Sequence, residues 1–382
     1  MRFFLFFAIV LTVFGLVNFY IIRRGRQALA GTGALRTVVL IIYLCLVLCF
    51  FIGHVLARSR PGRLAEMVTI AGSFYLGILI YLLLFVTLVD LLRWANHIIP
   101  FFPGLIREHG RSAGQAAFFA VVGMTLALVF GGFIHMRHVR IKTMDITIGK
   151  PAADIKSLNL VLLADIHVGP FMHSPRLEKI VQMVNSLDPD LVLIPGDVVN
   201  EETLATELEK MTVTFRKIHS RFGVFASTGN HEYFAGIEKS LDYLRRSGFT
   251  VLQDEAVLVD NSFYVVGRSN SDYIVRRDRR KSLKEILNGA DLNLPVILLD
   301  HQPVHLGDAA EAGVDLELSG HTHGGGVFPF TIINNLIYEI ALGYGRKGKT
   351  QYYVTSGVGV WEPPARIGTT AEIVLMRVTF QP

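Results

Sequence analysis

The chain has 382 residues, of which 51% are apolar, and 37 basic against 32 acidic residues give it a formal net charge of +5. A composition this apolar excludes an ordinary soluble protein. The positive charge belongs to residues 1–143, which carry +11, whereas residues 144–382 carry −6. Because the C-terminal part is acidic, it offers no basic face to a nucleic acid, and we expect no such partner.

Residues 1–143 contain four apolar stretches, each long enough to cross a bilayer, which takes about 20 residues. They run from Phe3 to Ile22, Leu35 to Ala57, Met67 to Leu92 and Gln115 to Met136. The first lacks a small-residue cleavage pattern and is followed directly by Arg23-Arg24-Gly25-Arg26, which is typical of an uncleaved anchor. The sequence therefore predicts a multi-pass cell-membrane protein with a transmembrane region at 1–143 and a second domain at 144–382.

The distribution of basic residues does not decide on which side of the membrane the C-terminal domain lies. Seven basic residues flank the predicted spans on each side, so the positive-inside count is balanced. The flanks of the first span favour a cytoplasmic position for the loop that follows it. That orientation would place the C-terminal domain outside the cytoplasm.

From Met144 onward, short apolar runs alternate with helical segments. Strands are expected at 159–164, 191–194, 223–227, 296–299, 314–318, 352–355 and 373–378. Helices are expected at 174–187, 202–219 and 236–246, and a further helix begins at the capping box that Ser282 and Glu285 form. This alternation predicts an α/β domain whose chemistry lies in loops at the carboxyl ends of the strands.

Five polar clusters follow these strands. They are Asp165-x-His167, Gly196-Asp197 with Asn200, Gly229-Asn230-His231-Glu232, Asp300-His301-Gln302-Pro303, and Gly320-His321-Thr322-His323-Gly324. Their carboxylate, amide and imidazole groups are ligands for divalent metals. A single cluster of this kind is explained by a helix cap or a turn, but five at successive strand ends indicate a metal centre.

At these clusters the chain resembles the calcineurin-like metallophosphoesterase superfamily, over about residues 157–378 and with the motifs in family order. Within it, the chain is similar to the membrane-associated or exported bacterial branch, which shares the stretches Leu299–Pro303 and Ser319–Gly325. The resemblance implies a β-sandwich flanked by helices and a centre of two divalent ions, manganese, iron or zinc.

The resemblance also implies a role for each site residue. Asp165, His167 and His323 would bind the first ion, Asn230, His301 and His321 the second, and Asp197 both. His231 would approach the scissile phosphate without binding metal, and Arg366 would contact the substrate.

Metal chemistry supports this set independently. Two divalent ions about 3.5–4 Å apart need a shared anion, so one carboxylate must bridge them. A water between the ions would lose a proton near neutral pH and attack the phosphorus. His231 is suited to protonate the leaving oxygen or to bind a phosphate oxygen.

Two residues depart from the family pattern, and two other motifs do not point to a phosphoesterase. Glu232 stands where Asp is commoner in the family, and Gly326 where Gln is common, and neither is expected to touch a ligand. The glycines of Gly343–Gly348 lead into a strand, which indicates a hairpin and not a dinucleotide site. The basic run Arg276–Lys281 fits a phosphate or lipid-headgroup contact and a solvated loop equally well.

Together these features predict a membrane-anchored, two-metal phosphoesterase that cleaves a phosphodiester, a pyrophosphate or a lipid-linked phosphate. Membrane lipids would be its partners, since Arg137, Arg140 and Lys142 follow the fourth span and attract anionic headgroups. The alternative is a catalytically silent metal-binding sensor or scaffold on the same fold. The complete ligand set together with His231 favours the enzyme.

Overall fold

A computed structural model describes residues 2–200, 203, 205–270 and 280–381 of the chain. The chain divides into two compact units, the first comprising Met1–Phe133 with Glu362–Pro364 and the second Ile134–Trp361 with Ala365–Pro382. The division predicted between residues 143 and 144 falls inside a strand, β1 (Arg140–Ile148).

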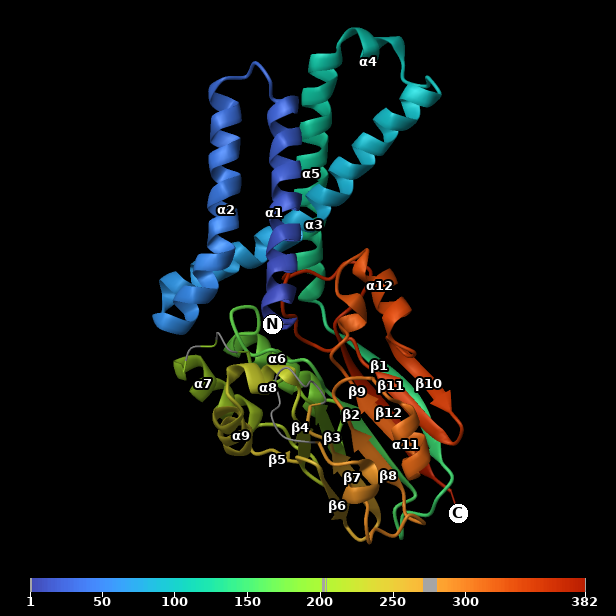
Figure 1. The fold of residues 1–382 in the computed structure, drawn as a ribbon. Helices are drawn as coiled ribbons and strands as arrows, with labels where there is room; N and C mark the ends of the chain where they lie inside the picture. The colour runs from blue at the N-terminus through green and yellow to red at the C-terminus, as the bar shows by residue number, and fades with distance from the viewer. Residues whose placement is uncertain (1, 201–202, 204, 271–279, 382) are drawn as a thin grey trace. The chain divides into compact units, whose positions relative to one another are not determined.

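The first unit is helical (Figure 1). Its helices are α1 (Arg2–Ala28), α2 (Ala34–Ser59), α3 (Arg63–Ile98), α4 (Gly104–Glu108) and α5 (Gly110–Met136), whose last turn belongs to the second unit. All except the short α4 are long and apolar enough to cross a membrane, which agrees with the four predicted spans. Large apolar side chains such as Leu16, Ile42 and Val55 are exposed on these helices, as expected of surfaces that face lipid.

The second unit contains two six-stranded sheets (Figure 1). The first sheet has the order β1, β12 (Glu372–Phe380), β2 (Ser157–Leu162), β3 (Leu191–Pro195), β4 (Val224–Ser227), β5 (Thr250–Val251). The second has the order β10 (Gly343–Lys347), β11 (Thr350–Val354), β9 (Leu316–Ser319), β8 (Val296–Leu299), β7 (Phe263–Gly267), β6 (Glu255–Val259). β10 and β11 form the predicted hairpin.

Helices cover the outer faces of both sheets, as the apolar clusters show. The helices described in this unit are α6 (Ser174–Asn185), α7 (Ala205–Phe215), α8 (Asn230–Ala235), α9 (Ile237–Arg246), α10 (Leu283–Ile286), α11 (Gly307–Ala312) and α12 (Phe330–Ile337), with one 3-10 turn, η1 (His323–Gly325). One cluster joins residues of both sheets, one joins the first sheet to α6, α7 and α9, and one joins the second sheet to α10 and α11. The β-sandwich flanked by helices is therefore confirmed.

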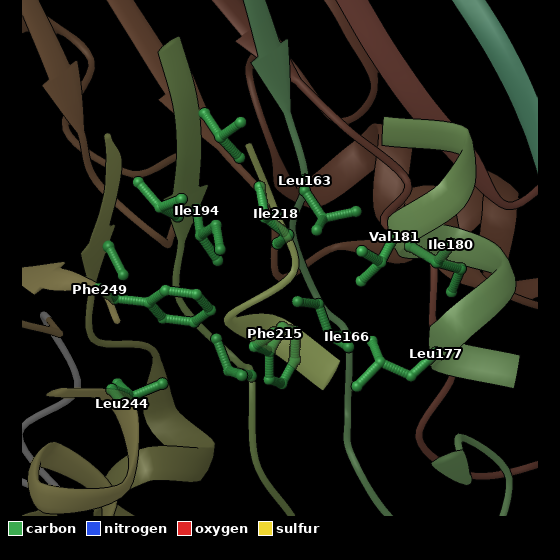
Figure 2. Close-up of a cluster of buried hydrophobic side chains, with 14 of the residues drawn as sticks. Leu163, Ile166, Leu177, Ile180, Val181, Ile194, Phe215, Ile218, Leu244 and Phe249 are labelled. Atoms are coloured by element: carbon green, nitrogen blue, oxygen red, sulfur yellow. The ribbon is translucent and has the colours of Figure 1, made fainter. Parts of the chain in front are cut away.

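Helix α6 shows how sequence periodicity sets this packing. Its buried residues Leu177, Ile180, Val181 and Val184 recur at helical spacing, and Pro175 stands at the start of the helix. Figure 2 shows Leu177, Ile180 and Val181 on α6, together with residues of the β2 and β3 strand ends in the same cluster.

Strand direction decides where the loops meet. β2, β3, β4 and β5 run parallel in the first sheet, and β7, β8, β9 and β11 run parallel in the second. The carboxyl ends of β2, β3, β4, β8 and β9 carry the five polar clusters. One edge of the sandwich therefore collects all the predicted ligands.

Candidate metal centre

The loops at this edge hold an unusual backbone. Asp165, His167, Asp197, His321 and His323 all have positive φ, between 49° and 67°. Residues other than glycine avoid this left-handed region, and where they adopt it the surrounding structure must hold them there. Such strain concentrates at functional sites, and here it falls on five of the seven predicted ligands.

Three predicted ligands form a first group. The ligand atoms of Asp165, His167 and His323 lie within 4.8 Å of one another. The Nε2 atoms of His167 and His323 are 3.1 Å apart, and His323 Nε2 lies 3.9 Å from Asp165 Oδ1. Two imidazole nitrogens that face each other beside a carboxylate suit a shared cation.

The other predicted ligands form a second group next to the first. Asn230 Oδ1 lies 3.0 Å from His321 Nδ1 and 3.2 Å from His301 Nε2. Asp197 Oδ2 lies 3.1 Å from His301 Nε2 in this group and 3.9 Å from His167 Nε2 in the first. Asp197 therefore stands between the two groups of predicted ligands.

Neighbouring oxygens fix which imidazole nitrogen carries the proton. His167 Nδ1 donates to Asn200 Oδ1 at 2.9 Å, and His301 Nδ1 donates to the carbonyl of Pro195 at 2.8 Å. In the neutral His167 ring the lone pair is then on Nε2, the atom that faces the site. Asn200, noted in the sequence only as part of a cluster, is thus a support for His167.

Glu232 holds the main chain around Asp197. Its buried carboxylate accepts hydrogen bonds from the backbone N–H groups of Asp197 (3.0 Å), Val198 (2.7 Å), Val199 (3.2 Å) and Gly229 (2.7 Å). The expectation that Glu232 touches no ligand is therefore wrong. A side chain at Gly229 would lie 2.7 Å from the backbone nitrogen of Asp197, so only glycine allows this approach.

Arg366 is buried, with 1% of its surface exposed. Its Nη2 donates to the carbonyls of Ser356 and Gly359, both at 2.6 Å, and lies 3.3 Å from His323 Nδ1. From this geometry we expect Arg366 to position His323. Its contact with a substrate stays a prediction.

The basic run predicted at Arg276–Lys281 is described only in part, because residues 276–279 lie outside the described residues. Arg280 pairs with the buried carboxylate of Asp300, which Arg268 also contacts at 3.2 Å. Asp300 precedes His301 in the chain. Arg280 is thus part of an ion-pair network behind a predicted ligand.

His231 lies at the side of the two groups. Its backbone N–H donates to Asp197 Oδ1 at 2.9 Å, and its ring meets those of His167 and Trp361 edge-on, with centroids 4.7 and 5.2 Å apart. A ligand atom of His231 also lies within 4.8 Å of those of His167 and Asp197. Trp361, which is 43% exposed, carries no signal in the sequence that assigns it to this site.

Burial and charge set the protonation of the site. Burial lowers the pKa of His167 and of His321 to about 3, so both imidazoles are neutral. Burial opposes ionisation of Asp197, but His301 and His231 hold the pKa of its carboxyl well below the usual value. Burial and the charge of Asp197 raise the pKa of Asp165.

The residues present fit divalent metal. Asp165 Oδ2 is buried, and the described residues offer it no hydrogen-bond partner. A buried carboxylate oxygen without a donor is costly unless a cation neutralises it. Nitrogen and oxygen donors of this kind suit manganese, iron and zinc.

Comparisons with known proteins agree with this site. Residues 158–325 match the family model described as calcineurin-like phosphoesterase. An "uncharacterized metallophosphoesterase" of Aquifex aeolicus is 33% identical over 267 residues, which cover 67% of this chain and 98% of that protein. A Helicobacter pylori protein with the same description is 35% identical over 225 residues, which cover 58% of this chain and 60% of its own length.

A third relative is described as a transmembrane protein. The "transmembrane protein with metallophosphoesterase domain" of Danio rerio is 30% identical over 290 residues, which cover 71% of this chain and 66% of that protein. The chain thus matches nearly all of the Aquifex protein but only about two thirds of the other two relatives.

Proposed function

Because the chain belongs to the calcineurin-like phosphoesterase family, and is therefore a metal-dependent phosphoric ester hydrolase, we propose that it cleaves a phosphodiester, a pyrophosphate or a lipid-linked phosphate at a membrane. The observation that carries this proposal is the position of Asp197 between two groups of buried ligands. Asp165, His167 and His323 would hold one ion, Asn230, His301 and His321 the other, and Asp197 both.

When bound, two divalent ions supply positive charge to phosphate oxygens and make water a stronger acid. The chain's own residues orient these groups. Glu232 fixes the loop of Asp197, Asn200 fixes the ring of His167, and His231 would give a proton to the leaving oxygen.

Helix α12 supports a substrate held at a membrane surface. Ile332, Leu336 and Ile337 are exposed by 53%, 82% and 69%. α12 follows the loop of His321 and His323 and packs closely on it, since a side chain at Gly325 would lie 2.6 Å from the backbone of Thr331. An exposed apolar patch marks a surface that meets membrane or protein, and in a membrane-anchored chain it favours lipid.

Hydrolysis by the full chain in vesicles tests the proposal. We expect nitrophenolate release from bis(p-nitrophenyl) phosphate with manganese, iron or zinc, its loss on chelation, and its loss in Asp197→Asn. A monoester, p-nitrophenyl phosphate, compares the two substrate classes. A protein that binds these metals but cleaves neither compound, nor a pyrophosphate, would support the silent sensor or scaffold instead.

A further inference from the structure

The membrane-spanning helices line a cavity that the phosphoesterase reaction does not use. Its volume is about 360 Å³, within the range of about 300–1,000 Å³ that small-molecule sites occupy. All four long helices contribute to it, and Ile21, Tyr43, Leu82 and Val121 are among its lining residues. The cavity lies entirely within the first unit.

The wall of this cavity carries an excess of positive charge. Arg24, Arg26, Arg36 and Arg93 line it together with one acid, Asp90. Four arginines against one aspartate leave a surplus of three positive charges.

Asp90 is already engaged by its neighbours. Arg24 Nε lies 2.7 Å from Asp90 Oδ2, Arg93 Nη1 lies 3.6 Å from Oδ1, and the hydroxyl of Tyr20 donates to Oδ2 at 2.6 Å. Within the described ranges, no carboxylate is within ion-pair distance of Arg26 or Arg36. Arg36, a half-buried residue that lines the cavity, therefore has no anionic partner among the described residues.

A buried hydroxyl adds a second unmet polar group. Thr125 lines the cavity with 1% of its surface exposed, and its hydroxyl has no hydrogen-bond partner in the part of the chain that the structure describes. Other helical Thr hydroxyls donate to the carbonyl four residues earlier, as Thr12 does to Ala8 at 2.7 Å. The Thr125 hydroxyl makes no such bond in the part of the chain that the structure describes. The cavity thus combines apolar walls, surplus cationic charge and a free donor.

We propose that this cavity binds one phosphate-bearing lipid from the bilayer. The guanidinium groups of Arg36 and Arg26 match a phosphate, which Arg binds with two parallel N–H donors. The apolar wall takes the acyl chain, which a free phosphate would lack. This site is separate from the metal centre and does not depend on the proposed reaction.

Lipid titration of the detergent-purified full chain, read by native mass spectrometry with phosphatidylglycerol, tests the proposal. Arg36→Gln should weaken binding about fivefold, the effect of removing about 1 kcal/mol of headgroup attraction. Arg36→Lys should retain most of the affinity. Arg60→Gln removes the same charge just beyond the other end of α2, at an exposed position outside the cavity, and should change nothing.

A second variant separates a lipid inside the cavity from lipids that merely meet arginines at the bilayer surface. Ala117 lines the cavity, so Ala117→Phe should occupy its space and weaken binding with no change in charge. Equal binding by Arg36→Gln and Arg60→Gln, or unchanged binding by Ala117→Phe, would overturn the proposal. So would diacylglycerol that binds as tightly as phosphatidylglycerol, or glycerol 1-phosphate that displaces the lipid at equal concentration.

Discussion

Glu232 shows how much of the predicted metal centre depends on one side chain that is not among the predicted ligands. Its carboxylate accepts four backbone hydrogen bonds, three of them from Asp197, Val198 and Val199. This acceptor holds Asp197 in its left-handed conformation, with φ of 53°. The side chain that bridges the two ligand groups is therefore set by a residue 35 positions away.

Glu232→Gln should lower both stability and metal content. The amide has one acceptor oxygen and turns an N–H group toward backbone donors, so about 3 kcal/mol of unfolding free energy should be lost. Thermal unfolding and metal analysis of the full chain measure this. Glu238→Gln, at an exposed position of α9, is the control. Unchanged stability and metal content in Glu232→Gln would show that Glu232 does not hold this loop.

His231→Ala should keep metal but slow hydrolysis by about 10²–10⁴-fold if the imidazole protonates the leaving oxygen. The loss should be much smaller for nitrophenolate, which leaves without a proton. Rates for nitrophenyl and alkyl phosphodiesters, compared between wild type and variant, measure the difference. An equal loss for both leaving groups would rule out the acid role.

The predicted ligands could be found in the sequence because each lies just after a strand within a short polar cluster. Their supports could not. Asn200 meets His167 across 33 positions, and Arg366 meets His323 across 43. The sequence placed Asn200 in a polar cluster and Arg366 at the site, but only folding brings them to His167 and His323, so their supporting contacts could not be predicted.

At the scale of elements, α12 is the part that links the metal loop to a membrane surface in our proposal. Leu336→Ser combined with Ile337→Ser should slow hydrolysis of a phospholipid in vesicles while soluble nitrophenyl diesters are cleaved at the wild-type rate. The control Val213→Ser removes another exposed apolar side chain, 58% exposed, from α7. An equal loss with both substrates would mean that α12 supports the fold of the site and not its contact with lipid.

Strand β9 carries a buried acid, Glu317, that should make stability depend on pH. Burial and the neighbouring Asp300 raise the pKa of Glu317 well above its usual value. The folded state then keeps a proton that the unfolded state releases above about pH 4.5, so stability falls as pH rises from there through the folded-state pKa.

Glu317→Gln should remove this dependence and raise the thermal midpoint more at about pH 8 than at about pH 5. Thermal unfolding of the full chain at both pH values measures it. Glu311→Gln, at an exposed position of α11, is the control. A midpoint difference between Glu317→Gln and wild type that is the same at both pH values would contradict the pKa shift.

Most elements with a continuous apolar run could be predicted, and β8 was predicted with its observed ends. β1 was missed because most of its residues are exposed and it includes Arg140, Lys142 and Asp145, so no apolar run marks it. Its strand form depends on parallel pairing with β12, more than 200 positions later. β6 was missed although Ala256–Val259 is an apolar run; it is an edge strand of the second sheet and pairs with β7.

On the scale of the molecule, the chain combines four helices fit to cross a membrane with a metallophosphoesterase domain. Length and apolarity made the helices predictable, and the five motifs made the domain predictable. The lipid cavity could not be foreseen, because its lining residues come from four helices separated by loops of different length. The orientation of the domain stays a prediction, since the basic residues divide equally between the two sides.

The central claim is a centre of two metal ions that Asp197 bridges. Metal analysis of the full chain by inductively coupled plasma mass spectrometry, after reconstitution with manganese, iron or zinc, tests it most directly. We predict two ions per wild-type chain, loss of both in Asp197→Ala and loss of mainly one in His301→Ala. A wild-type chain that holds one ion or none under all three conditions would contradict the account.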